Sequence, residues 1–165
     1  MKVLLPFLFL ALMSLRAPCA EVSRSFFDIQ LTHPKENWYA VATTNKQHGT
    51  AELMLMKEGK GKVAHVSLEK KAPEVTAFDA SELKKMQEQG TSARYKTISQ
   101  SFTNFLGERA YRTTAESSEL RGKSVAYFLY QGEKRYRVLA VCFQGNEPES
   151  DEEIGSILKS MKLAK

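Results

Sequence analysis

The strongest constraint on the fold is a pair of apolar segments, Ser124–Tyr130 and Lys134–Gln144, joined by a short turn at Gly132. Alternate residues of a strand point to opposite faces. The first segment is apolar on both, with one set of side chains (Val125, Tyr127 and Leu129) opposite the other (Ala126, Phe128 and Tyr130). A strand of this kind lies inside a sheet that is covered on each face. The sequence therefore predicts a β-hairpin at the centre of a layered domain.

Further segments are rich in strand-forming residues and are separated by turn signals. They are Ser25–Leu31, Trp38–Thr44, Glu52–Lys57, Val63–Glu69, Arg94–Phe105 and Ala110–Glu116. A turn expected over His33–Asn37 separates the first pair, because proline restricts the preceding residue and ends a ladder of backbone hydrogen bonds. Short connections between successive strands predict a mostly antiparallel sheet.

Helical patterns occur at Asp79–Gln89 and near the C-terminus. The first begins with the spacing of a capping box, Asp79 and Glu82, and ends before a glycine. The second begins with Ser150 as the expected N-cap and Glu153 as its partner. Its apolar residues follow one helical face, which we expect to dock on the sheet: Ile154, Ile157, Leu158 and Met161.

These elements predict the α+β class, specifically an α/β/α sandwich with a central, mostly antiparallel sheet and two main helices. No internal repeat, low-complexity tract or linker divides the sequence. The length of 165 residues suits one folded unit. We therefore expect a single domain over residues 21–165, preceded by a separate segment over residues 1–20.

Residues 1–20 have the layout of a cleavable secretory signal peptide. Lys2 is followed by an apolar run from Val3 to Leu15 and then by small residues. The run is too short to span a membrane as a helix. Cleavage after Cys19 or after Ala20 and lipidation of Cys19 are alternatives, of which lipidation fits the flanking Pro18 less well. We expect a periplasmic or secreted protein, associated with a membrane only if the signal is uncleaved or Cys19 is lipidated.

The charge pattern indicates no nucleic-acid partner. The chain has 24 basic and 19 acidic residues, a net charge of +5, and two of the basic residues belong to the signal segment. The remaining acidic and basic residues are interspersed, whereas a nucleic-acid binder shows a dense basic stripe. The small basic excess serves solubility.

Cysteine and histidine supply no recognisable catalytic or metal site. Cys142 lies in an apolar strand segment and is read either as a buried hydrophobe or as a reactive thiol, and we favour the first. His33, His48 and His65 lack the spacing of a zinc-binding helix. Trp38, at the start of a strand, is read as a cap of the core. The sequence therefore predicts no catalytic residues, no metal ligands and no cofactor.

The order of these features resembles that of the PsbP/Mog superfamily, including exported bacterial members such as DcrB-like proteins. The matching stretches are Phe26–Ile29 with His33-Pro34 and Asn37-Trp38, Leu106–Ala110, Lys134–Val138 and Ile157–Leu163. The resemblance covers residues 26–163. It implies an α/β/α sandwich that acts by binding rather than by catalysis, as in subunits that dock on photosystem II or in a protein that binds the GTPase Ran. Neither of those roles is carried over to this chain.

The sequence thus predicts an exported, non-catalytic binding or accessory protein that is not an enzyme. Its expected partner is another protein or an envelope assembly. The alternative is a small secreted enzyme, or a carrier of an apolar ligand, whose site forms only in three dimensions. A histidine beside a carboxylate in a cleft would favour the alternative, and a flat, exposed aromatic patch would favour the binding protein.

Overall fold

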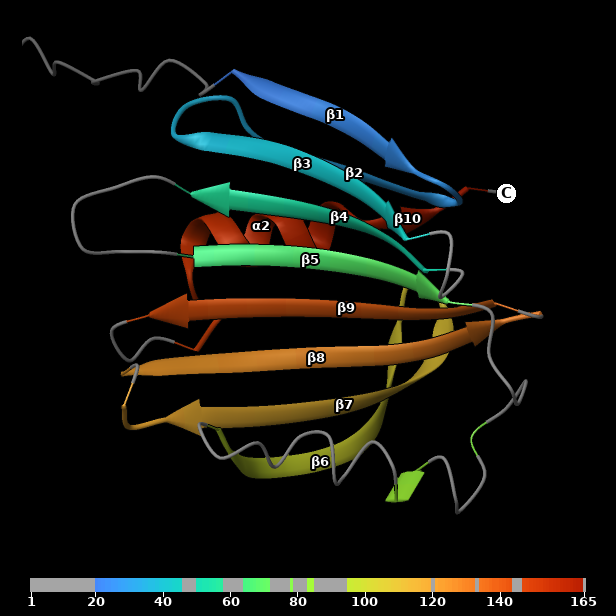
Figure 1. Ribbon diagram of the computed structural model, residues 1–165, viewed down its shortest axis with the longest axis vertical. Coiled ribbons are helices and arrows are strands. Elements are labelled where there is room, and N and C mark those ends of the chain that lie inside the picture. Colours follow the sequence, from blue (N-terminus) through green and yellow to red (C-terminus); the bar gives the residue numbers. More distant parts are fainter. Residues whose placement is uncertain are drawn as a thin grey trace, which may run out of the picture.

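The computed structural model describes residues 20–45, 50–57, 64–71, 78, 83–84, 95–119, 121–132, 134–143 and 147–164. Strands dominate this part of the chain (Figure 1). In order, the elements are β1 (Glu21–Phe26), β2 (Ile29–Pro34), β3 (Trp38–Asn45), β4 (Thr50–Lys57), β5 (Ala64–Lys71), β6 (Lys96–Phe105), β7 (Glu108–Ser117), β8 (Gly122–Gln131), β9 (Lys134–Phe143), α2 (Glu152–Ser160) and β10 (Lys162–Leu163).

The main sheet is antiparallel and has seven strands in the order β3-β4-β5-β9-β8-β7-β6. The predicted central hairpin is confirmed, since β8 and β9 are interior strands of this sheet. The two apolar faces of β8 contribute to two separate groups of buried apolar side chains. One contains Val125, Tyr127 and Leu129, and the other contains Ala126 and Phe128.

A smaller antiparallel sheet, in the order β1-β2-β10, lies at the β3 edge of the main sheet (Figure 1). Helix α2 lies behind β4 and β5 in this view. Ser160 at the end of α2 joins the helix to β2, because its hydroxyl oxygen accepts from the Thr32 N–H at 2.9 Å and donates to the Thr32 carbonyl at 3.1 Å. Strands and helix therefore share the layer that covers one face of the main sheet.

The expected α/β/α sandwich with two main helices is wrong, because the protein is mostly β. Among the described residues, α2 is the one helix seen from start to end, and it has 9 residues. Of the helix expected over Asp79–Gln89, only Leu83 and Lys84 lie within the described residues, and both are helical. The physical reason for the error is that the β1–β2 hairpin supplies part of a layer that we had assigned to helices alone.

The segment Ser25–Leu31, expected to be one strand, is divided by a turn at Phe27 and Asp28. Phe27 has a φ of 50°, in the left-handed region that a phenylalanine rarely adopts. Contacts made by Asp28 hold this turn: its carboxylate accepts from Lys134 Nζ at 2.8 Å and from the Tyr136 hydroxyl at 2.6 Å. The turn expected over His33–Asn37 is present but shorter: Lys35, Glu36 and Asn37 form it, while His33 and Pro34 belong to β2.

The C-terminal helix is confirmed, with its start shifted by one residue. Asp151, not Ser150, is the N-cap, and one of its carboxylate oxygens accepts from the Glu153 and Ile154 N–H groups, both at 3.1 Å. The predicted apolar stripe is buried as expected: Ile154, Ile157, Leu158 and Met161. Within the residues that the structure describes, no helix is long and apolar enough to cross a membrane.

Candidate functional site

The most concentrated group of polar contacts is formed by Glu149, Arg112 and Tyr127. Glu149 lies in the turn before α2, while Arg112 on β7 and Tyr127 on β8 are register partners. Arg112 Nε donates to Glu149 Oε1 at 3.0 Å, and its Nη2 donates to Oε2. The Tyr127 hydroxyl also donates to Oε1. A bidentate arginine contact with an added phenol satisfies most of the hydrogen-bonding capacity of a carboxylate.

These contacts move the pKa values of all three side chains of the group further from pH 7. The hydrogen bond from Arg112 holds the pKa of Glu149 below its usual range. Burial and the hydrogen bond to Glu149 raise the pKa of Tyr127 to about 12. The hydrogen bond to Glu149 also raises the pKa of Arg112. A general acid or base that acts near pH 7 needs a pKa near that pH, so this group fits a structural clamp rather than a proton-transfer site.

Glu149 and Tyr127 of the clamp form one wall of a pocket of about 350 Å³. The other walls come from the β6–β7 turn, with Phe105 and Leu106, and from α2, with Leu158 and Lys159. The tip of the β6–β7 hairpin curls behind β8 and β9, which brings it toward α2 (Figure 1). The volume lies at the lower end of the range of small-molecule sites, about 300–1,000 Å³.

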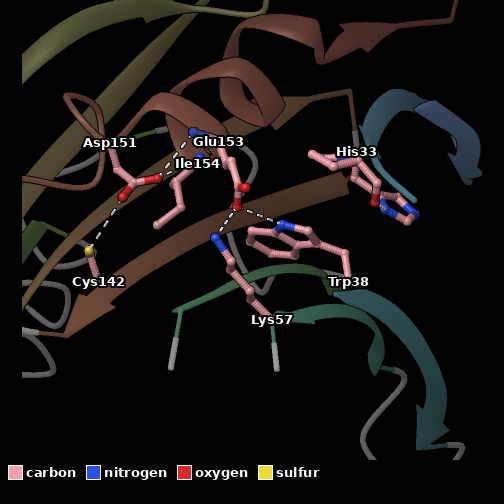
Figure 2. Close-up of polar contacts among 8 residues, drawn as sticks. His33, Trp38, Lys57, Cys142, Asp151, Glu153 and Ile154 are labelled. Carbon is pink, nitrogen blue, oxygen red and sulfur yellow. Dashed lines mark hydrogen bonds and ion pairs between the residues drawn. The ribbon is translucent and has the colours of Figure 1, made fainter. Parts of the chain in front are cut away.

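A second polar group joins α2 to β3 and β4. Figure 2 shows the Glu153 carboxylate between Trp38 and Lys57. Trp38 Nε1 donates to Glu153 Oε2 at 3.0 Å, and the Lys57 ammonium forms an ion pair with the same oxygen. Trp38 is 6% exposed, so the prediction that it caps the core is confirmed. Glu153 thus stabilises the position of the helix on the sheet.

Cys142 is 4% exposed, which confirms the prediction of a buried hydrophobe. Its Sγ lies 3.6 Å from the Phe143 carbonyl oxygen and 4.0 Å from Asp151 Oδ2 (Figure 2). Neither neighbour is a cation that would stabilise a thiolate, and the anionic Asp151 carboxylate disfavours one. Cys19 lies outside the described residues.

The histidines do not converge within the described residues. His33 is 2% exposed, with Nε2 accepting from Arg24 Nε at 3.0 Å and Nδ1 lying 2.7 Å from the Pro34 carbonyl oxygen. It stands apart from the Asp151 contacts in Figure 2, and neither of its two contacts described above is to a carboxylate. His48 lies outside the described residues. His65 is on β5, in register with Met56 and Val141. No group of metal-ligating residues was found among the described residues.

The outer face of β3 and β4 carries an exposed apolar row. Tyr39 is 38% exposed and Val41 is 42% exposed. Their register partners on β4 are Met56 and Met54, both partly exposed. The alternate residues of β4 are buried in the core, so this row belongs to the opposite face of the sheet. We call these four residues the β3–β4 patch.

Sequence reasoning missed both the clamp and the pocket. Glu149 lies 37 residues from Arg112 and 22 residues from Tyr127, so no local spacing connects them. Arg112 reads in sequence as a charged residue of a polar strand, and Glu149 as part of a loop. The one available signal was that Arg112 and Tyr127 lie on segments expected to be strands. Polar and amphipathic residues on strands also make many purely structural contacts, so this signal does not identify a site.

Replacing Tyr127 with Phe should reduce the fall in the free energy of unfolding that the wild type shows at alkaline pH. The raised pKa of Tyr127 means that its contribution is fully present below its unfolded pKa of 10.0 and is lost as the pH rises through about 12. The free energy of unfolding of the wild type should therefore fall between these values by on the order of 2 kcal/mol from this group. The Y127F variant should lack that part of the fall in urea titrations at pH 8, 10 and 12.

The matched control is Tyr39→Phe, at a tyrosine that is 38% exposed. It should follow the wild-type curve, including the part that Tyr136 contributes, since burial and Asp28 raise the pKa of that residue too. A Tyr127→Phe curve that runs parallel to the wild type over the same range would contradict the role assigned to the clamp.

Comparison with known proteins gives a structural likeness without a sequence match. No protein-family model matches the chain, and no curated protein does. The fold is similar to the solution structure of cyanobacterial PsbP (CyanoP) from Synechocystis sp. PCC 6803, with a TM-score of 0.61. The match covers 88% of this chain and 93% of that chain at 10% sequence identity. The fold is therefore PsbP-like, while the DcrB-like and Mog-like parts of the resemblance stay predictions.

Proposed function

We propose that the chain is an exported, non-catalytic binding protein that docks on another protein or an envelope assembly through the β3–β4 patch. The observation that carries this proposal is the exposure of Tyr39 and Val41 at 38% and 42% on the outer face of the sheet. The solvated face of an antiparallel sheet is ordinarily polar. A contiguous exposed apolar row marks an interaction surface.

The position of the patch supports a protein partner. It lies at the β3 edge of the main sheet, where, in the part of the chain that the structure describes, β3 pairs with β4 alone. Edge strands are places where a sheet can recruit a second chain. Tyr39 can contribute an aromatic ring and a hydroxyl, a combination that is enriched at protein interfaces.

The chemistry of the polar groups supports binding over catalysis. The pKa values of Glu149 and Tyr127 are displaced in opposite directions from neutral pH, and the carboxylate is held by Arg112. The PsbP-like fold is in keeping with a family whose members act by binding, although a shared fold does not carry a function by itself. Export rests on the signal peptide predicted at residues 1–20, which lies outside the described residues except for Ala20.

The proposal is tested by placing a photo-crosslinking amino acid at Tyr39 in the full chain, expressed in its native host. Irradiation should give one reproducible crosslinked partner from the envelope or the exterior. Adding Val41→Glu should abolish the adduct, because burying an unpaired carboxylate in an apolar contact costs several kcal/mol.

The control places the same crosslinker at Ser156, an exposed position on α2 away from the patch. It should not capture that partner. The proposal fails if Tyr39 and Ser156 give the same adducts, if the Val41→Glu variant captures the partner as well as its parent does, or if the captured partner is cytoplasmic.

A further inference from the structure

The pocket beside the clamp has an interior that is mostly apolar. Its walls include Phe105, Leu106, Leu158 and Met161. Phe105 stacks on Tyr127 with ring centroids 4.0 Å apart and an interplanar angle of 9°, which fixes the orientation of both rings. An entering molecule therefore meets a rigid aromatic surface, Leu158 of α2 and Met161 just after the helix.

The polar atoms inside the pocket are already bonded to one another. The Glu149 carboxylate holds Arg112 and the Tyr127 hydroxyl, so its charge is balanced and its oxygens are occupied. A ligand would have to break these bonds to use the carboxylate, at a cost that a single new hydrogen bond does not recover. Selection inside the pocket therefore depends on shape and apolar surface.

The exposed side of the pocket carries a positive charge. Asn104 and Lys159 are the exposed residues among those that line the pocket, so we take them as its mouth. Among the described residues, Lys159 takes part in none of the ion pairs found. The last turn of α2 carries a partial negative charge that Lys159 offsets. An anionic group that binds here would therefore contact the Lys159 ammonium from the solvent side. It would not contact the backbone carbonyls of the last turn of α2.

We propose that this pocket binds a small amphiphile, with an apolar body between Phe105 and Leu158 and an anionic head group on Lys159. The site is distinct from the β3–β4 patch and does not depend on the proposed docking function. The volume of about 350 Å³ fits a short chain or a single ring system rather than a long lipid chain. A carboxylate on an alkyl or aryl body is the simplest molecule of this class.

The probe for the test is octanoate, with octylammonium as a probe of the same length and opposite charge. Each is titrated below its aggregation concentration into the ¹⁵N-labelled chain and followed by NMR. Octanoate should bind with a Kd on the order of 0.1–1 mM, as expected for an unoptimised ligand of its size. The largest shifts should fall on residues 104–106 and 155–161, and octylammonium should bind at least several-fold more weakly.

Two variants separate the head-group contact from the apolar contact. Lys159→Gln should raise the Kd for octanoate about five-fold, the scale of one exposed ion pair, and should leave octylammonium binding unchanged or stronger. Lys162→Gln removes a nearby exposed lysine that does not line the pocket and should have no effect. Leu106→Trp, at a partly buried turn position on the pocket wall, should block both probes.

Three results would overturn the proposal. They are equal affinity for the two probes, equal effects of Lys159→Gln and Lys162→Gln, and shifts centred on the β3–β4 patch in place of the pocket. Thermal unfolding of each variant confirms that it is folded, and a Leu106→Trp chain that does not fold leaves the comparison of the two lysine variants decisive. Failure here leaves the crosslinking result at Tyr39 untouched, so the two proposals fail separately.

Discussion

Gly155→Ala should lower the free energy of unfolding by about 1–3 kcal/mol, the scale of an overpacked site. In a helix this substitution ordinarily stabilises, because alanine loses less backbone entropy on folding than glycine. Here a Cβ at Gly155 would lie 2.7 Å from the Glu149 backbone carbonyl oxygen. Either the first turn of α2 or the Glu149 turn must move, and the second movement draws the Glu149 carboxylate away from Arg112.

The matched control is Ser156→Ala, at the next residue of the same helix, where the side chain is exposed. It should leave stability unchanged or raise it slightly. Urea unfolding at pH 7 measures both variants. A Gly155→Ala chain that is as stable as the wild type would show that the helix and the Glu149 turn are not in close contact.

Ile157→Ala should lower the free energy of unfolding by about 2–4 kcal/mol, because it removes buried methyl groups and leaves a cavity. Ile157 is 1% exposed and lies in the cluster that joins α2 to both sheets. The surrounding strands are held by ladders of backbone hydrogen bonds and have little freedom to close the space. The loss should appear as a lower urea midpoint with an unchanged slope.

Ile98→Ala makes the same chemical change at a residue that is 52% exposed on β6. Its expected cost is below about 1 kcal/mol, which reflects strand preference rather than burial. The difference between the two variants measures the packing of α2 separately from the intrinsic effect of the substitution. Similar costs at both positions would contradict the placement of α2 against the sheet.

The two proposed surfaces make different demands on the fold. The β3–β4 patch requires an open sheet face near Tyr39 and Val41, whereas the pocket requires the β6–β7 turn to stay close to α2. Gly155→Ala should disturb the pocket, through the Glu149 turn, and spare the patch. Measuring octanoate binding and crosslinking at Tyr39 on this variant therefore shows whether the two surfaces are independent.

Local patterns predicted most of the strands and the C-terminal helix. The alternation of apolar residues in 124–130 and 134–144 was enough to place β8 and β9 inside the sheet. The helical spacing of Ile154, Ile157 and Leu158 was enough to identify the buried side of α2. The N-cap was placed one residue early because Ser150 and Asp151 can both accept a backbone hydrogen bond, and sequence alone does not choose between them.

The errors occurred where a local pattern was silent. No glycine or proline marks the turn between β1 and β2, so the left-handed φ of Phe27 had no sequence signal. Asp28 holds that turn through Lys134 and Tyr136, which are more than a hundred residues away in the chain. The layer opposite the main sheet was therefore assigned to helices, although strands make up part of it.

By itself, the sequence determined the strand and helix periods, the burial of Cys142 and the capping position of Trp38, because each depends on neighbours a few residues away. Only the tertiary structure decided the Glu149–Arg112–Tyr127 clamp, the pocket beside it and the β3–β4 patch. The clamp joins a turn to two strands, and the patch exists because β3 is an edge strand with its outer face exposed. Such features depend on which segments become neighbours in space, and the free energy that selects those neighbours is shared by the whole core rather than encoded in any one segment.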